Sequence, residues 1–288
     1  MSAAFREGPR AMASADGRRL RLVHGPIDLH VTLEGPEEAL RGAGARARSV
    51  FVDILPRLAE ELPRLRHPGG PRPEGPVARR MVRAVRPFAP LFVTPMAAVA
   101  GSVADHVLAA MLVPGHGLRR AIVNNGGDIA IWLASGTLRV GLCDDPVART
   151  LPGRIAIGAG DGIGGIATSG WRGRSHSLGI ADAVTVLARD AAAADAAATL
   201  IANAVDLPGH PTIERRPAVA LAPDSDLGER PVTTGVGTLS AAEIGAALDA
   251  GAACAAVFRA RGWIAAACLS LCGEIRILGT KLELPAHA

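Results

Sequence analysis

Aromatic side chains are scarce in this sequence. Phe, Trp and Tyr together make up 3% of the 288 residues, and tyrosine is absent. Proteins that bind single-stranded nucleic acid without sequence preference stack the bases on aromatic rings, so this composition argues against a nucleic-acid partner. The formal net charge is +4, but Lys281 is the only lysine. Such arginine-rich usage is as typical of high-GC coding as of a surface for polyanions.

Cysteine is equally sparse and shows no metal-binding pattern. The chain has no CxxC pair and no zinc-type histidine spacing around its four cysteines, Cys143, Cys254, Cys268 and Cys272. The N-terminus lacks the apolar segment of a secretion signal. We also find no uninterrupted run of about 18 apolar residues that would cross a membrane. We therefore expect four free thiols in a cytoplasmic protein without a membrane partner.

The remaining composition is that of a folded protein. Hydrophobic residues make up 49% of the chain and charged residues 20%, which excludes wholesale disorder. The length allows one large domain or two packed lobes with an ample core. We expect a disordered leader over residues 1–20 and a single domain over residues 21–288.

Hydrophobic periodicity predicts an α+β fold of mixed, mainly antiparallel sheets with interspersed helices. Alternation of apolar and polar residues indicates a strand at 27–34, and Ala134-Ser135-Gly136 has the spacing of a hairpin turn. Helices are expected at 36–65, 77–88, 95–113, 191–204 and 241–259. Further strands are expected at 121–124, 128–133, 137–142, 155–158, 183–188, 218–222, 231–238, 263–271 and 274–278.

The stretch from Ile155 to Asn203 contains many of the candidate functional residues. Within it, residues 183–188 are almost wholly apolar, as expected of a strand buried on both faces, and Asp190 stands where a helix N-cap would. On the following alanine-rich helix, Asp195, Thr199 and Asn203 are four residues apart and share one face. These three residues could form a ligand site. Alternatively, Asp195 could be exposed to solvent and the Thr199 hydroxyl could bond to the backbone of its own helix.

A second short polar segment, flanked by apolar residues, runs from Asn124 to Asp128. Its two glycines, Gly126 and Gly127, permit positive φ, so backbone amides and side chains could converge on a ligand. A plain two-residue hairpin turn explains the same residues, and taken alone the turn is the favoured interpretation. Inside helix 95–113, Gly101 suggests a close backbone approach, while Ser102 and Asp105 fit a site and a solvated face equally well.

A glycine-rich stretch at 160–165 formally contains GxGxxG. A dinucleotide-binding fingerprint requires a helix directly afterwards, and the polar loop from Thr168 to His176 follows instead, so we reject that interpretation. His176 is the one histidine among small polar residues and is a candidate base; an exposed arginine-rich loop is the alternative. We expect this loop and the Asn124–Asp128 turn to converge near helix 191–204.

Four segments, taken together, resemble the ApbE-type proteins, the FAD:protein FMN transferases. They are AGSVAD at 100–105, AIVNNGGDI at 121–129, ATSGW at 167–171 and ADAAAT at 194–199. Each is short, but they occur in the family's order across roughly residues 94–204. The resemblance implies the ApbE-like fold and a flavin nucleotide as ligand.

The resemblance also implies roles for individual residues. The family positions that match Asp195 and Thr199 hold the divalent metal that bridges the FAD pyrophosphate, which implies Mg²⁺ here. Independently of the resemblance, Asp182 at the start of the expected strand 183–188 is a candidate for a nearby third carboxylate. His176 or Asp182 would activate an acceptor or water. The implied nucleotide-binding residues are Ser102, Asp105, Asn124, Asn125, Gly126, Gly127, Asp128, Thr168, Ser169 and Gly170.

Two departures from the family pattern keep two functions open. The family's GxxKGxxxD lysine has no counterpart in Ala98–Ser102, and its Asp-Pro-Arg-Thr-Gly segment is replaced by Ser177–Asp182. One function is a Mg²⁺-dependent flavin transferase or pyrophosphate hydrolase with an acceptor protein as partner. The other is a non-catalytic binding or accessory protein with a changed ligand.

Overall fold

The computed structural model describes residues 8–142, 153–279 and 282–283, and the chain divides into two units. Unit 1 comprises Met1–Thr137, Gly158–Ile166 and Asp190–Ala193. Unit 2 comprises Leu138–Ile157, Ala167–Arg189 and Ala194–Ala288. Every strand pairing with a defined register is antiparallel, and helices separate the strands along the chain. The predicted mainly antiparallel α+β class is therefore confirmed.

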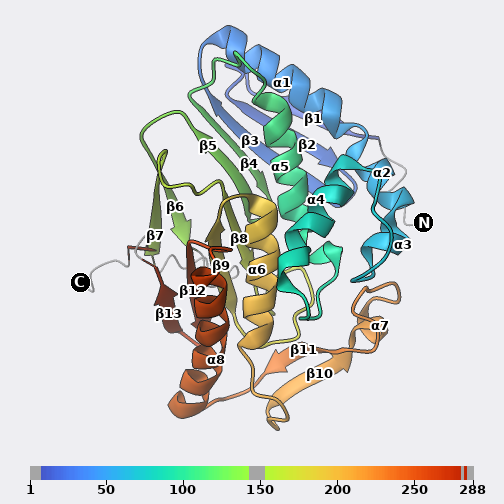
Figure 1. Ribbon diagram of the computed structural model, residues 1–288, viewed down its shortest axis with the longest axis vertical. Coiled ribbons are helices and arrows are strands. Elements are labelled where there is room, and N and C mark those ends of the chain that lie inside the picture. Colours follow the sequence, from blue (N-terminus) through green and yellow to red (C-terminus); the bar gives the residue numbers. More distant parts are fainter. Residues whose placement is uncertain (1–7, 143–152, 280–281, 284–288) are drawn as a thin grey trace. The chain divides into compact units, whose positions relative to one another are not determined.

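Unit 1 is built on an antiparallel run of strands. In spatial order these are β1 (Arg10–Ala13), β2 (Arg19–His24), β3 (Ile27–Glu34), β4 (Arg120–Asn125) and β5 (Asp128–Leu133) (Figure 1). The first residues of β8 (Gly165–Ser169) pair with β5. Side chains of β2 and β3 alternate between buried and accessible positions, as the sequence pattern at 27–34 predicts. Strand β1 and the start of β2 lie where a disordered leader was expected, so that expectation is wrong for residues 10–20.

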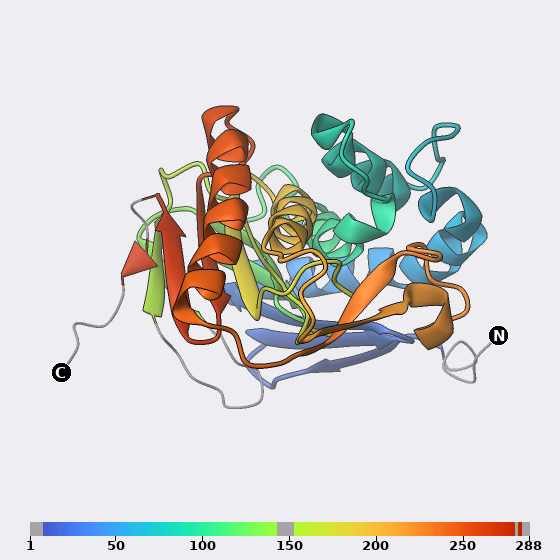
Figure 2. The same ribbon diagram turned by 90° about the horizontal axis from the view of Figure 1, so that it is seen from below.

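Helices cover one side of these strands (Figure 2). They are α1 (Glu37–Phe51), α2 (Ile54–Glu60), α3 (Leu62–Leu65), α4 (Pro76–Val85) and α5 (Val99–Met111), with 3₁₀ turns at Arg86–Phe88 and Pro95–Ala98. Phe51, Leu22, Leu29, Met81 and Met111 are fully buried in the core beneath them. The single helix expected over 36–65 is broken into three, because Pro56 and Pro63 each fit only the first turn of a helix.

Unit 2 contains a further antiparallel set, whose strands β9 (Ala183–Ala188), β12 (Ala266–Leu271) and β13 (Glu274–Leu278) belong to the same nine-stranded sheet as β1 to β5. Strand β12 pairs on one side with β9 and on the other with β13. All six residues of β9 and of β12 are buried, which confirms the prediction for 183–188. The remaining strands are β10 (Ile213–Pro217) with β11 (Pro231–Val236), and β14 (Leu282–Glu283), β7 (Gly153–Gly158) and β6 (Thr137–Leu142) in that order.

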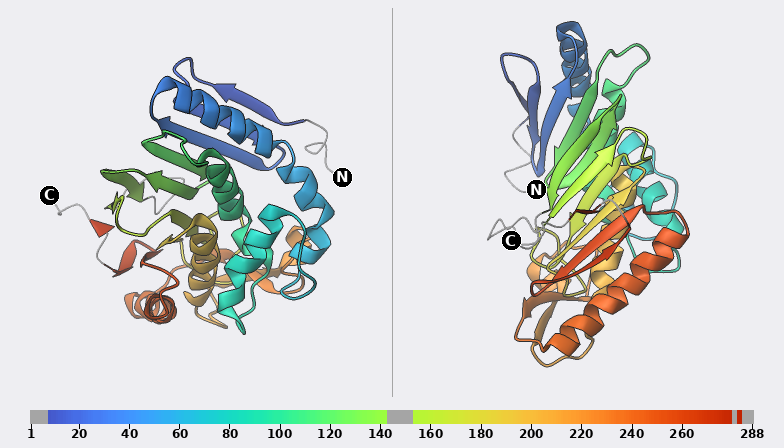
Figure 3. Two further views of the ribbon diagram at one scale, coloured as in Figure 1. Left: turned by 45° about the horizontal axis from the view of Figure 1, so that its top comes forward. Right: turned by 90° about the vertical axis from the view of Figure 1, so that its left-hand side faces the viewer.

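Three helices complete the chain: α6 (Ala191–Ala204), α7 (Ala218–Leu221) and α8 (Ala241–Ala260). Helix α8 packs against β12 and β13, and the right panel of Figure 3 shows it lengthwise beside the red strands. By length and mean hydropathy alone α8 qualifies as a membrane-spanning helix, although Glu243 and Asp249 interrupt its apolar sequence. One of its faces, including Ile244, Leu248 and Phe258, is nevertheless buried inside unit 2.

Two local expectations are wrong. Residues 218–222 were expected to form a strand, but Ala218–Leu221 form the short helix α7, which directly follows β10. Strand β6 pairs with β7, so the hairpin expected at Ala134-Ser135-Gly136 does not form. Short apolar runs fit either a strand or a buried helix, and their periodicity does not choose between them.

The cysteines are free thiols wherever the structure describes them. These are Cys254, Cys268 and Cys272, whereas Cys143 lies outside the described residues. Burial raises the pKa of the Cys254 thiol to about 11, so this group is protonated at neutral pH.

Cys272 occupies an unfavourable backbone position. It has φ of 49° and precedes Gly273 with φ of 83°, and together they form the two-residue loop of the β12–β13 hairpin. Such turns favour Asn-Gly, because asparagine tolerates the left-handed region better than other non-glycine residues. We expect Cys272→Asn to stabilise the protein by about 1 kcal/mol in urea unfolding. Cys272→Ala, which removes the thiol but keeps the strain, should leave stability unchanged; an equal gain in both variants would contradict this explanation.

Candidate functional site

The buried N-terminus of α6 is held by two carboxylates. Asp190 Oδ1 accepts a hydrogen bond from the Ala193 amide at 2.8 Å, which confirms the predicted N-cap. Asp105, on α5, accepts from the Ala191 amide at 3.1 Å and from the Ala192 amide at 2.9 Å. The first three amides of α6, which have no partner within the helix, are therefore all satisfied by side chains.

Two glycines allow α5 and β8 to approach this helix start closely. A Cβ atom on Gly101 would lie 2.3 Å from the Ala191 carbonyl oxygen, and one on Gly165 would lie 2.2 Å from the Ala191 nitrogen. Real Cβ atoms essentially never come so near to backbone atoms. The close approach expected at Gly101 is therefore confirmed, and Gly165 is a second such position.

Burial dominates the electrostatics of Asp105. Only 5% of this residue is exposed, and desolvation raises the pKa of its carboxyl group to about 6. The two helix amides, and Arg80 at 3.9 Å, oppose this rise, while the negative charge of Asp190 adds to it. With a pKa of about 6, the Asp105 carboxyl group changes its protonation state just below neutral pH. Beside it in α5, the buried Ser102 hydroxyl has no hydrogen-bond partner among the described residues.

The segment from Asn124 to Asp128 forms the predicted hairpin turn. Asn125 and Asp128 are paired across the β4–β5 ladder, and both intervening glycines, Gly126 and Gly127, have positive φ. Asn124 Oδ1 accepts from the Gly127 amide at 2.9 Å, and Asn125 Nδ2 donates to the Ala100 carbonyl at 3.1 Å. These contacts account for the two asparagines as turn and packing residues; nucleotide binding by this turn stays a prediction.

In unit 2, the Asp182 carboxylate accepts hydrogen bonds from the residues that follow β8 and from the β12–β13 turn. Its Oδ1 accepts from Trp171 Nε1 at 3.1 Å and from Arg172 Nε at 2.6 Å, and its Oδ2 accepts from the Cys272 amide at 2.6 Å. Gly170 fits closely here, because an added Cβ would lie 2.4 Å from the Asp182 carbonyl oxygen. With three donors on its carboxylate, Asp182 acts as a positioning residue for the loop.

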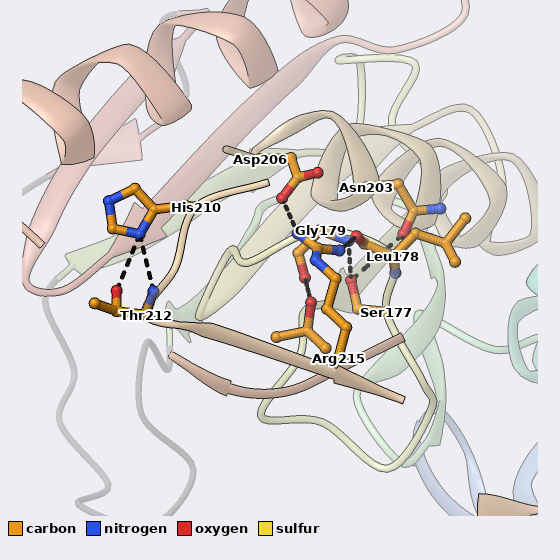
Figure 4. Close-up of polar contacts among 9 residues, drawn as sticks. Ser177, Leu178, Gly179, Asn203, Asp206, His210, Thr212 and Arg215 are labelled. Carbon is orange, nitrogen blue, oxygen red and sulfur yellow. Dashed lines mark hydrogen bonds and ion pairs between the residues drawn. The ribbon is translucent and has the colours of Figure 1, made fainter. Parts of the chain in front are cut away.

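The rest of the loop is fixed by α6 (Figure 4). Asn203 Oδ1 accepts from the Leu178 amide at 2.9 Å, and the Ser177 hydroxyl lies 3.4 Å from the same oxygen. Arg215, on β10, reaches both Asp206 and the Leu178 carbonyl. Asn203, the third member of the predicted stripe, therefore anchors the loop rather than facing a ligand.

Other predicted residues of unit 2 are more accessible. His176 is exposed at the end of the loop, and Ser169 is partly exposed. Thr168 shares a hydrogen bond of 2.8 Å with Thr185. Along α6, Asp195 and Thr199 are partly exposed, whereas the positions between them are buried. Among the residues that the structure describes, no cluster of three or more His, Cys, Asp or Glu could hold a metal ion.

The predicted site residues are thus divided between the two units. Ser102, Asp105 and the Asn124–Asp128 turn belong to unit 1, whereas the Thr168–His176 loop, Asp195 and Thr199 belong to unit 2. Their convergence on one ligand stays a prediction. The pairing of Asp182 with Trp171 and Arg172 escaped sequence reasoning because no spacing rule connects residues ten apart across a loop. The rejection of a dinucleotide fingerprint at 160–165 is confirmed, since strand β8 follows it.

Comparison with known proteins identifies relatives over most of the chain. The UPF0280 protein of Methanothermobacter thermautotrophicus is 35% identical over 199 residues, covering 67% of this chain and 72% of that protein. The UPF0280 protein of Methanothrix thermoacetophila is 41% identical over 133 residues, which are 45% of this chain and 52% of that protein. The match thus spans about half the length of the second relative.

Structural comparison finds the ApbE protein of Thermotoga maritima, with 13% identity and a TM-score of 0.45. The match covers 69% of this chain and 88% of that chain. A family model described as AbpE bacteria matches residues 10–277, well beyond the segment that carries the four motifs. The chain therefore belongs to the ApbE-like family.

Proposed function

We propose that this protein binds a flavin nucleotide such as FAD together with Mg²⁺, which Asp195 and Thr199 help to hold. The proposal rests on the solvent accessibility of two positions on α6. In a helix that is otherwise buried from Ala191 to Ala202, Asp195 and Thr199 alone are partly exposed. They are also the two positions that the family motif assigns to the metal.

The chemistry of these two residues fits Mg²⁺. A carboxylate and a hydroxyl one helical turn apart offer hard oxygen ligands on the same face of the helix. Mg²⁺ commonly completes its shell with water and substrate phosphates, so two protein ligands suffice only when a phosphorylated ligand is present. When bound, the ion would neutralise pyrophosphate charge.

The residues around the loop divide into two roles. The Asp182 carboxylate holds Trp171, Arg172 and the Cys272 amide, so we assign it to positioning rather than to proton transfer. His176, exposed on the same loop, is the group we propose to activate an acceptor or water. A cytoplasmic location and an acceptor protein are parts of the same proposal.

A non-catalytic accessory function is the second candidate. It is favoured by the missing lysine at 98–102 and by the replacement of Asp-Pro-Arg-Thr-Gly with Ser177–Asp182. Incubation with FAD and Mg²⁺ separates the two functions. Release or transfer of FMN that disappears in His176→Ala identifies the enzyme, whereas binding of FAD without turnover identifies the accessory protein.

Calorimetric titration with FAD tests the metal site directly. In the wild-type protein we expect FAD to bind at least about tenfold more tightly with Mg²⁺ than with EDTA, since a divalent cation would offset the negative charges of the pyrophosphate and of Asp195. Asp195→Ala should abolish this difference and leave the melting temperature almost unchanged, because Asp195 is partly exposed. Asp249→Ala, which removes an exposed carboxylate from α8, is the matched control and should behave as wild type. Equal FAD binding in wild type and Asp195→Ala under both conditions would reject the site.

A further inference from the structure

Unit 1 contains a cavity that none of the residues assigned to the flavin nucleotide lines. Its volume is about 210 Å³, and its lining residues come from the end of α1, from α2 and its flanking residues, from the start of α4 and from α5. Most of its wall is apolar, formed by Val50, Ile54, Leu58, Pro76, Val77 and Ala78. We call this cavity, together with Asp53, Arg57, Glu61, Gly75 and His106 at its wall, the α2 pocket.

The α2 pocket adjoins a wider and more polar hollow of about 650 Å³. Asp53, Arg57, Glu61 and Gly75 line both spaces. The charged residues therefore stand where the apolar chamber meets the outer hollow. A ligand could place an apolar group inside and charged groups at this entrance.

The charged groups at the entrance differ in what they already bind. Both Glu61 oxygens are occupied, because they accept hydrogen bonds from the Glu74 amide at 2.8 Å and the Gly75 amide at 2.7 Å. Asp53 is the N-cap residue of α2 and Arg57 follows four residues later in the last turn, where its backbone amide donates to the Asp53 carbonyl at 3.2 Å. Within the described part of the chain, neither of these two side chains makes a hydrogen bond or an ion pair. One carboxylate and one guanidinium thus face the entrance ready for a ligand.

His106 adds a neutral polar group to the wall. Burial, and then the positive charges of Arg80 and Arg57, lower the pKa of its imidazole below the ordinary value. The ring is therefore uncharged at neutral pH and contributes a hydrogen-bonding group without a further positive charge.

We propose that the α2 pocket binds a free amino acid with an apolar side chain. Its carboxylate would pair with Arg57, its ammonium group would pair with Asp53, and its side chain would fill the chamber. The size agrees, because about 210 Å³ is below the ~300–1,000 Å³ typical of pockets for drug-sized ligands.

Charge complementarity selects this class over simpler ligands. Asp53, Arg57 and Glu61 give the pocket one positive and two negative groups, which disfavours a plain organic acid. An amine without a carboxylate would leave Arg57 without a partner. A peptide N-terminus has the ammonium group but no adjacent carboxylate. A zwitterion satisfies both groups at once.

Titration calorimetry with L-leucine and two analogues tests the proposal. The analogue 4-methylpentanoate lacks the ammonium group, and 3-methylbutylamine lacks the carboxylate. We expect saturable binding of L-leucine, and binding at least about tenfold weaker for each analogue, because each leaves one charged partner unpaired. Absence of saturable L-leucine binding, or analogues that bind as tightly as L-leucine, would overturn the proposal.

Variants locate the site. Arg57→Gln and Asp53→Asn should each weaken L-leucine binding about tenfold or more, and circular dichroism should show an unchanged fold because both side chains are exposed. Arg83→Gln, on the exposed side of α4, lines neither hollow and should bind L-leucine as wild type does. Equal affinity in all three variants would place any leucine binding elsewhere and reject the α2 pocket. FAD binding should be unchanged in every variant, which separates failure of this proposal from failure of the flavin site.

Discussion

Asp105→Ala should destabilise the protein by about 2–4 kcal/mol, measured by urea unfolding at pH 7. The substitution leaves the Ala191 and Ala192 amides buried without an acceptor, and each such loss costs about 1–3 kcal/mol. Part of this cost is offset, because the variant no longer buries a carboxylate whose desolvation is unfavourable. Asp190 still caps Ala193, so the helix should shift or fray at its first turn rather than unfold entirely.

The pH dependence of stability separates this electrostatic explanation from simple loss of packing. The pKa of Asp105 is about 6 in the folded protein and 3.8 for the ordinary group. The folded state therefore binds the proton more tightly than the unfolded state, and stability from this group rises as the pH falls from about 6 to 4. Relative to Asp105→Asn, which does not titrate, wild type should gain on the order of 2–3 kcal/mol across that window. A difference between the two proteins that stays constant from pH 7 to pH 4 would contradict the buried carboxylate.

Sequence reasoning succeeded where the signal was local. Residues 128–133, 183–188 and 191–204 have the predicted bounds, because alternation, continuous β-branched runs and an N-cap each act within a few residues. The Asn124–Asp128 turn follows from the same kind of local chemistry. The family assignment rested on the order of four motifs, and it holds over most of the chain.

The contacts that define the candidate site could not be predicted in this way. Asp105 caps a helix that begins 86 residues later, and Asp182 accepts a hydrogen bond from an amide 90 residues away. Both carboxylates look like ligand groups in the sequence, since nothing local satisfies them. Only the fold shows that two backbone amides occupy the Asp105 oxygens, and that one backbone amide and the Trp171 and Arg172 side chains occupy those of Asp182. Asp195 and Thr199 retain accessible positions, which is why the metal proposal rests on them.

Gly165→Ala should destabilise the protein by about 3 kcal/mol or more and lower the yield of soluble protein. The added Cβ would lie 2.2 Å from the Ala191 nitrogen and 2.2 Å from the Asp190 carbonyl carbon. These are backbone atoms at a helix start that Asp105 and Asp190 already fix, so they cannot yield as the end of a flexible side chain would. Relief requires β8 and the first turn of α6 to separate, which would also break the Asp105 hydrogen bonds.

Gly160→Ala is the matched control for this prediction. Gly160 precedes Gly165 by five residues, has no neighbouring atom within 4 Å of an added Cβ, and is not among the glycines with positive φ. Its replacement should leave the melting temperature unchanged or slightly raised, because alanine restricts the unfolded chain more than glycine does. Thermal unfolding of both variants by circular dichroism measures the contrast. If the two variants melt together near wild type, the close approach of β8 to α6 is not a constraint on this fold. If only Gly165→Ala has a strongly lowered melting temperature, the glycine at the start of β8 is required for packing against α6, the helix that carries Asp195 and Thr199.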